Sequence, residues 1–270
     1  MNILNAVILG IVQGLTEFLP VSSSGHLVIL QKLFDINEPG LFLDTMLHFG
    51  TLLAVFAVLW KDILDLLKKP FQMLTLYLII ATIPAVIAAL LFKDSIEEIF
   101  KSAQFLGWCF LITTALLITA ELLSRRAVSA NNQKPKKSMN WIDALVIGIM
   151  QAIAIPPGIS RSGATISGAL FRRLDRDFAA RFSFLLSIPA ILGALVLQVK
   201  DIFDSGASEI ADLNIAAIIT GTACAALVGF FAVKFMLKII REKSLFGFAI
   251  YTGILGILII FDQMVTHIAF

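Results

Sequence analysis

The chain has 270 residues, of which 59% are hydrophobic and 15% are charged, and its mean hydropathy is +0.93. Soluble domains are about half apolar and about a quarter charged, so this composition excludes an ordinary soluble protein and predicts one that spans a membrane. The formal net charge of +2 gives no support to nucleic-acid binding, and we expect none.

The first hydrophobic segment, residues 3–34, is interrupted by EFLPVSSSGHL at residues 17–27, which we call the first hinge. An acid, a proline, three serines, a glycine and a histidine break the apolar pattern there. The segment therefore predicts two half-length helices joined by a polar stretch. We expect them to form a re-entrant hairpin, the first hairpin, which enters and leaves the bilayer on one face.

Three ordinary membrane-spanning helices follow, at about 41–60, 71–92 and 104–124. Residues 125–140 are polar and basic, and they predict a cytoplasmic loop. The next apolar segment, residues 141–173, is again broken in its middle, by PPGISRSGAT at residues 156–165, the second hinge. We expect a second re-entrant hairpin here, followed by spans at about 179–199, 212–238 and 245–262.

Lysine and arginine predict the sidedness of this arrangement. If the span at 41–60 runs from outside to inside, sixteen of the 21 basic residues fall in cytoplasmic stretches. These stretches are 61–70, 125–140, 172–181 and 234–243. The two hairpins then enter from opposite faces and point toward each other.

An internal repeat supports opposed hairpins. Residues 5–27 align with residues 143–165 without a gap, and seven of the 23 pairs are identical, including Ser22/Ser160 and Gly25/Gly163. Chance similarity between two apolar helices is the alternative interpretation. We predict an inverted-topology repeat with halves at about 1–124 and 141–262, joined by the loop 125–140.

The second hinge has the residues of an anion site. Arg161 is flanked by Ser160, Ser162 and Thr165 at the expected start of a half-helix. Arginine binds phosphate oxygens in a bidentate manner, and a helix N-terminus attracts negative charge. Phosphate binding is therefore the favoured interpretation, and a structural ion pair between Arg161 and Glu17 is the alternative.

The first hinge adds groups suited to catalysis. Gln13 and Glu17 are four residues apart, and Ser23 and His26 are three apart, so each pair shares a helical face. A hydroxyl, an imidazole and a carboxylate in one pocket suit nucleophilic attack with proton transfer. The pair Asp44 and His48, in the next span, could reach the same cavity, although a self-contained pair at the membrane interface is the favoured interpretation.

At this point the chain resembles a known family, the bacterial undecaprenyl pyrophosphate phosphatases, which are linked to bacitracin resistance. The resemblance rests on QGLTEFLPVSSSGHL, LFLDTMLHFGTLLAV, PGISRSGAT and RFSFLLSIPAILGA, and it extends over essentially the whole chain. It implies a multi-pass enzyme of the bacterial inner membrane with its active site open to the outer, periplasmic face. Such an enzyme hydrolyses undecaprenyl pyrophosphate to undecaprenyl phosphate and inorganic phosphate, which recycles the lipid carrier for peptidoglycan synthesis.

The resemblance also implies site residues and a cofactor. The matching positions are Gln13 and Glu17 for a motif that holds a divalent cation, Mg²⁺ or Ca²⁺, then Ser23 and His26 for catalysis, and Pro157, Gly158, Ser160, Arg161, Ser162 and Thr165 for phosphate binding. Gln13 stands where a second carboxylate is also found, so we expect weaker metal binding. The implied partners are a polyprenyl pyrophosphate substrate and membrane lipids, and the oligomeric state stays open, a homodimer included.

In the expected mechanism, Arg161, Ser160 and Thr165 bind the pyrophosphate, and Ser23 attacks the terminal phosphorus with His26 as its proton-transfer partner. Glu17 contributes to catalysis through the cation. Alternatives are His26 as the nucleophile or direct attack by water. A lipid-carrier flippase or transporter is the second function considered, because inverted repeats with broken helices are typical of transporters. An ion channel ranks last, since acid, base and hydroxyls are mixed in the hinges.

Overall fold

A computed structural model describes residues 2–34, 41–205 and 214–267. Regular structure in these ranges is helical, apart from one isolated bridge between Lys134 and Leu174. The helices are α1 (Ile3–Thr16), α2 (Ser23–Leu33), α3 (Leu41–Val58), α4 (Trp60–Lys68), α5 (Met73–Leu91), α6 (Lys93–Ser102), α7 (Leu106–Ser129), η1 (Lys136–Ser138), α8 (Trp141–Ile153), α9 (Arg161–Phe171), α10 (Arg176–Ser205), α12 (Ile215–Glu242), α13 (Phe246–Phe261) and the π-helical η2 (Asp262–Thr266). The predicted all-α fold is confirmed.

Five of the described helices are long and apolar enough to cross a membrane, namely α5, α7, α10 as far as Leu197, α12, and α13 with η2. The pair α3 and α4 supplies a sixth candidate that bends by 81° at its break. The prediction of about six membrane-spanning helices is therefore confirmed. Helices α1 and α8 are shorter apolar helices, as expected for the first arms of two broken segments.

Two boundaries differ from the predictions. The span expected at 41–60 ends at Val58, and the chain turns into α4, in which Ile63 is buried while the lysines are exposed. The loop expected at 125–140 begins as helix, because α7 continues to Ser129. Ser124 and Ala127 remain buried there, so the inward-facing side of α7 extends beyond its apolar stretch.

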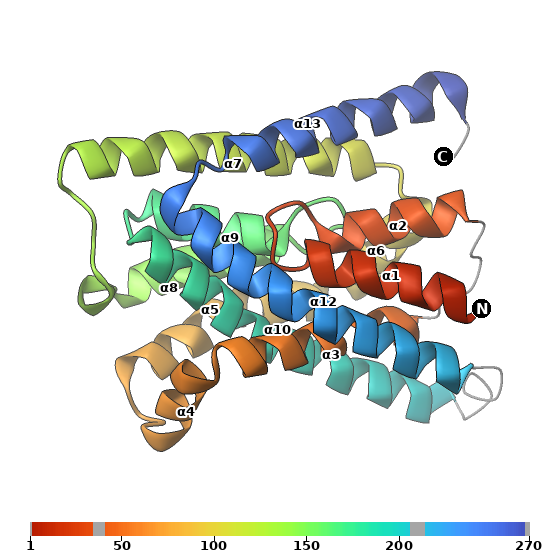
Figure 1. The fold of residues 1–270 in the computed structure, drawn as a ribbon, viewed down its shortest axis with the longest axis horizontal. Helices are drawn as coiled ribbons and strands as arrows, with labels where there is room; N and C mark the ends of the chain where they lie inside the picture. The colour runs from red at the N-terminus through yellow and green to blue at the C-terminus, as the bar shows by residue number, and fades with distance from the viewer. Residues whose placement is uncertain (1, 35–40, 206–213, 268–270) are drawn as a thin grey trace.

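Helix packing explains how the hairpins are held. In Figure 1, α7 and α13 lie side by side along one face of the molecule. Helix α1 packs along α12, and α8 packs along α5. A Cβ atom at Gly10 would collide with the carbonyl oxygen of Gly221, and one at Gly148 would collide with that of Ala81. Glycine at the two aligned positions thus allows each hairpin to contact its neighbour backbone to backbone.

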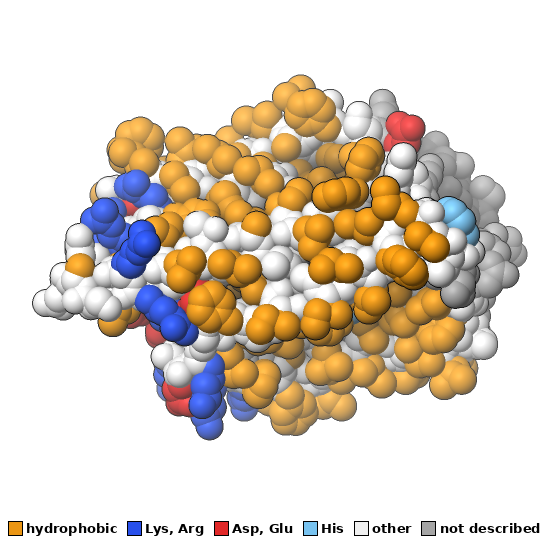
Figure 2. All heavy atoms as spheres, turned by 90° about the horizontal axis from the view of Figure 1, so that it is seen from above, with side chains coloured by type: hydrophobic (Ala, Val, Ile, Leu, Met, Phe, Trp, Pro, Cys, Tyr) orange, Lys and Arg blue, Asp and Glu red, His pale blue; other side chains and the backbone are white. Residues whose placement is uncertain are grey.

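The surface separates charge from apolar area. Figure 2 shows lysine and arginine side chains gathered at one end of the molecule, with hydrophobic side chains over the rest of that face. This end holds α4, the end of α7 and the start of α10. The separation agrees with the distribution of basic residues in the sequence, and a broad apolar surface is what a bilayer requires.

Candidate active site

The tips of the two hairpins meet. The Oγ atom of Ser22 accepts hydrogen bonds from the backbone N–H of Gly25, at 3.3 Å, and of Gly158, at 3.1 Å. In the opposite direction, the hydroxyl of Ser162 donates to the backbone oxygen of Leu19 at 3.0 Å. The structure therefore brings the first and second hinges into direct contact, as the repeat predicted.

The aligned serines make matching contacts in the two hinges. Ser160 Oγ accepts from the N–H of Gly163 at 3.0 Å, just as Ser22 Oγ accepts from that of Gly25. Each of these N-cap hydroxyls also lies near the hydroxyl two residues later, at 3.2 Å in the second hinge and 3.4 Å in the first. The backbone differs at one point, since Ser22 has φ +70° and Ser160 has φ −71°. The division of the whole chain into two repeat halves stays a prediction.

Glu17 lies at the centre of the contact. It is 4% exposed and forms an ion pair with Arg161. Its Oε2 atom accepts hydrogen bonds from Gln13 Nε2 at 2.9 Å and from Ser23 Oγ at 2.5 Å. The structure thus unites four of the predicted residues, one carboxylate with an amide, a hydroxyl and a guanidinium. The ion pair considered as the alternative role of Arg161 is present.

His26 has other partners than predicted. Its Nδ1 atom lies 2.7 Å from the backbone oxygen of Ser22, and its Nε2 atom lies 2.7 Å from the hydroxyl of Tyr251 on α13. The Ser23 hydroxyl is instead bonded to Glu17. Sharing a helical face therefore did not pair Ser23 with His26, because a carboxylate and a phenol from other elements offered better-placed partners.

The remaining predicted residues build the second hinge. Ser160, Ser162 and Thr165 are each at most 4% exposed, and Thr165 bonds to the hydroxyl of Ser183 at 2.6 Å. Gly158 has φ +94°, a left-handed conformation that favours glycine. The phosphate-binding role predicted for these side chains stays a prediction, and within the predicted set Arg161 presents a partly exposed side chain, at 22%.

Sequence reasoning missed Thr113. Its hydroxyl donates to the backbone oxygen of Gly158 at 2.9 Å and accepts from the N–H of Ser160 at 3.0 Å. It thereby satisfies two backbone groups of the second hinge that α9 leaves unpaired. A threonine within the long apolar helix α7 carries no local signal of this role.

His48 was assigned to a self-contained interfacial pair with Asp44, and this interpretation is wrong. Nδ1 of His48 bonds the backbone oxygen of Asp44 at 2.7 Å, and Nε2 lies 3.4 Å from Glu17 Oε2. The Asp44 carboxylate accepts from the side-chain amide of Gln31 instead. The i,i+4 spacing indicated only that Asp44 and His48 share a helical face, and it could not identify Glu17 as the group that His48 meets.

The predicted metal ligands do not form a cation site in this arrangement. Glu17 is already occupied by Arg161, Ser23 and Gln13, and Gln13 presents its N–H₂ group rather than its oxygen to the carboxylate. The Gln13 Oε1 atom is buried without a partner. The same is true of Gln151 Oε1 at the aligned position, although no acid lies four residues after Gln151, so the unpaired oxygen does not by itself indicate a cation site. Among the described residues, no cluster of three or more His, Cys, Asp or Glu could hold a metal ion.

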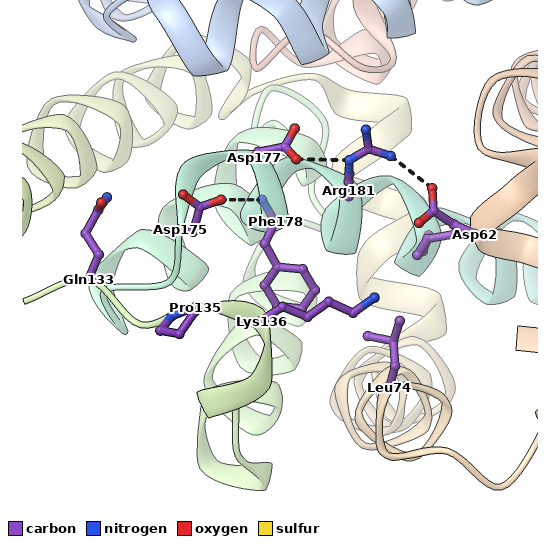
Figure 3. A pocket seen from close by; sticks show the side chains of 10 residues that line it. Asp62, Leu74, Gln133, Pro135, Lys136, Asp175, Asp177, Phe178 and Arg181 are labelled. Atoms are coloured by element: carbon purple, nitrogen blue, oxygen red, sulfur yellow. Dashed lines mark hydrogen bonds and ion pairs between the residues drawn. The ribbon is translucent and has the colours of Figure 1, made fainter. Parts of the chain in front are cut away.

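A separate cavity of about 400 Å³ lies at the basic end of the molecule, away from the hinges (Figure 3). Arg181 pairs there with Asp62 at 2.9 Å and with Asp177 at 3.1 Å, and Asp177 also pairs with Arg241 at 2.6 Å. The residues that line the cavity include three carboxylates, Asp62, Asp175 and Asp177, and two cations, Lys136 and Arg181, so the lining disfavours an anion such as phosphate. The cavity therefore does not compete with the hinges as the phosphate site.

Comparison with known proteins finds similar chains over nearly the whole length of this one. A family model described as "Bacitracin resistance protein BacA" matches residues 6–258. Undecaprenyl-diphosphatase 4 of Bacillus thuringiensis (strain Al Hakam) is 50% identical over 268 residues, which cover 99% of this chain and 100% of that protein. Undecaprenyl-diphosphatase of Carboxydothermus hydrogenoformans is 46% identical, over 97% of this chain and 98% of that protein.

Proposed function

We propose that the two hinges of this chain, which belongs to the bacitracin resistance protein BacA family, together hydrolyse undecaprenyl pyrophosphate. The protein is an undecaprenyl-diphosphatase, and its products are undecaprenyl phosphate and inorganic phosphate. The observation that carries the assignment of the site is the contact of Arg161 and Ser23 with the same buried carboxylate, Glu17. Lipid transport, the alternative, is not favoured by the family.

Binding begins with Arg161, the partly exposed cation at the start of α9. The terminal phosphate offers two oxygens to its guanidinium, and the helix N-terminus adds to the attraction. Ser162 holds α9 against the first hinge through its hydrogen bond to the backbone oxygen of Leu19. Ser160 caps the first turn of α9, and Thr165 bonds the backbone oxygen of Arg161. The phosphate then takes the place of the Glu17 carboxylate at Arg161.

This exchange prepares the nucleophile. Once Arg161 moves to the phosphate, Glu17 loses a counter-charge and becomes a better proton acceptor for the Ser23 hydroxyl, which already donates to it at 2.5 Å. Ser23 Oγ attacks the terminal phosphorus as its proton passes to Glu17, and the bond from that phosphorus to the bridging oxygen breaks. Undecaprenyl phosphate leaves with the bridging oxygen and its electron pair. Water then attacks the phosphorus of the phosphoseryl group and passes a proton to Nε2 of His26. The bond from phosphorus to Ser23 Oγ breaks as Glu17 returns its proton to that oxygen, and inorganic phosphate leaves.

The acceptor of the Ser23 proton in this scheme is Glu17 rather than His26, and the change rests on the hydrogen bond between Ser23 and Glu17. Since the side chains as arranged do not form a cation site, no step is assigned to a metal. We further propose that the enzyme resides in the bacterial inner membrane with the hinges open to the periplasm. The gathering of lysine and arginine at the opposite end supports this orientation (Figure 2).

The test is phosphate release from undecaprenyl or farnesyl pyrophosphate by detergent-purified protein. Ser23→Ala and Arg161→Ala are compared with Ser138→Ala and Arg126→Ala, which change the same residue types outside the hinges. We expect turnover to be lost in the first two and retained in the controls. Wild-type turnover in Ser23→Ala would exclude Ser23 as the nucleophile and leave His26 or water, and retention in Arg161→Ala would exclude the phosphate site.

A further inference from the structure

Tyr251 is an unpredicted neighbour of the site. It lies on α13, near the other end of the chain from the first hinge, and its side chain is 46% exposed. Its hydroxyl lies 2.7 Å from His26 Nε2, and the two rings are stacked, with centroids 5.7 Å apart and an interplanar angle of 8°. Phe110 of α7 meets the His26 ring edge-on, at 5.6 Å. The imidazole is therefore held between two aromatic rings.

The hydrogen bonds define which nitrogen of His26 carries hydrogen. Nδ1 lies 2.7 Å from the backbone oxygen of Ser22, and a carbonyl oxygen can only accept, so Nδ1 is protonated. In the neutral ring Nε2 then holds a lone pair, and the hydroxyl of Tyr251 donates to it. When Nε2 takes up a proton, the same hydroxyl can turn and accept from it. Tyr251 can thus serve both protonation states without moving its ring.

The contact between Nδ1 and a backbone oxygen also occurs at His48. Its Nδ1 atom also bonds the backbone oxygen four residues earlier, that of Asp44, and its Nε2 atom faces Glu17. In both histidines, Nε2 therefore faces a partner that influences whether this nitrogen is protonated. For His48 that partner is the central carboxylate, and for His26 it is a phenol from a distant helix.

We propose that Tyr251 is a positioning residue for His26: the Ser22 backbone oxygen selects the Nδ1–H tautomer, and the Tyr251 hydroxyl holds Nε2 as the atom where a proton enters and leaves during turnover. The inference rests on the proposed function for its role in turnover, but its geometric part concerns the substrate-free protein. The proposal predicts that the Tyr251 hydroxyl is required to hold Nε2 of His26 and that the stacked ring alone is not sufficient.

The variant that isolates the hydroxyl is Tyr251→Phe, since the ring remains able to stack. The chain has two tyrosines, and Tyr77→Phe, on α5, is the matched control. The chain also has three histidines, so the imidazole nitrogens of ¹⁵N-histidine-labelled protein in micelles can be assigned with His26→Ala and His48→Ala. The measurement is the ¹⁵N shift of each nitrogen in wild type and in the two phenylalanine variants.

We expect wild-type His26 to show a protonated Nδ1 and a hydrogen-bonded, unprotonated Nε2. In Tyr251→Phe, Nε2 should shift toward the value of an unbonded pyridine-type nitrogen, while Nδ1 stays protonated and His48 stays unchanged. Tyr77→Phe should change neither histidine. An unchanged His26 in Tyr251→Phe, or a wild-type ring protonated at Nε2 alone, would overturn the proposal.

Kinetics separate positioning from folding. We expect Tyr251→Phe to lower kcat by about ten- to a hundredfold, as loss of a partner of a functional histidine usually does, with KM and thermal stability little changed. An unchanged kcat would refute the role in turnover. If wild type itself released no phosphate, the proposed function would fail, and the ¹⁵N shifts would still decide whether the Tyr251 hydroxyl bonds Nε2 of His26.

Discussion

Replacing Glu17 by glutamine tests the centre of the site, because the variant keeps the shape of the side chain and removes its charge. Glu17 is 4% exposed, and the Arg161 side chain that it neutralises is 22% exposed. Removing one partner of a buried ion pair costs about 3–5 kcal/mol, because the other charge is left without compensation. Since Arg161 keeps some access to solvent, we expect Glu17→Gln to lower the free energy of unfolding by about 3 kcal/mol, the lower end of that range.

The same substitution removes the proton acceptor of Ser23. Loss of a general base lowers the rate by about a hundredfold to ten-thousandfold, and this is the expected loss of kcat in Glu17→Gln. The assays are phosphate release from farnesyl pyrophosphate and equilibrium unfolding in mixed SDS–detergent micelles. Glu17→Gln/Arg161→Gln, which removes both charges, should regain at least about 1 kcal/mol of stability over the Glu17→Gln single variant, because the unpaired cation is gone.

Two results would refute this reasoning. If Glu17→Gln unfolded like wild type, the carboxylate would not be compensating Arg161. If it turned over within about threefold of wild type, a general base worth a hundredfold or more could not be Glu17. An ion pair that only stabilises the fold would make Glu17→Gln less stable than wild type without lowering its kcat.

Three further predictions concern the surroundings of the site. In Gly25→Ala the new methyl group would lie 2.6 Å from Phe110 Cζ, and we expect overpacking to cost about 1–3 kcal/mol, measured by unfolding against the exposed control Ser138→Ala. Thr113→Val leaves the N–H of Ser160 unpaired and should cost about 1–3 kcal/mol with a fall in turnover; unaltered stability would contradict the role of its hydroxyl. Because Arg161 already neutralises Glu17 and the side chains as arranged do not form a cation site, EDTA should leave the melting temperature of substrate-free protein unchanged; a lower melting temperature would reveal a bound cation that these contacts do not predict.

Much of the fold could be predicted because the bilayer restricts what a sequence can do. Long apolar runs become spanning helices, and polar residues inside such a run must be satisfied by protein, which marked both hinges. The alignment of Ser22 with Ser160 then predicted that the hinges share one local structure, and their matching N-cap contacts agree. Helix α4 was missed since its mixed charged and apolar pattern has no long apolar run.

The site was less predictable because spacing along one helix does not reveal partners from others. Ser23 and His26 are neighbours in sequence, yet one bonds Glu17 and the other bonds Tyr251. Similarly, His48 reaches Glu17 from α3, although its pattern fits a local pair with Asp44. The partners of these side chains are set by how helices far apart in the sequence pack together, and a short sequence motif holds no information about that packing.

The glycine contact between Gly10 and Gly221 has a consequence for how the protein is made. Helix α1 leaves the ribosome before its packing surface on α12 is made, because α12 lies later in the chain. The first hairpin therefore lacks this surface until α12 is inserted, even after the second hinge has supplied Gly158 and Arg161 as partners of Ser22 and Glu17. The second hairpin finds α5 already in place, since α5 precedes α8 in the chain. A chain cut short before α12 should therefore leave the first hairpin without this packing surface and exposed to membrane proteases.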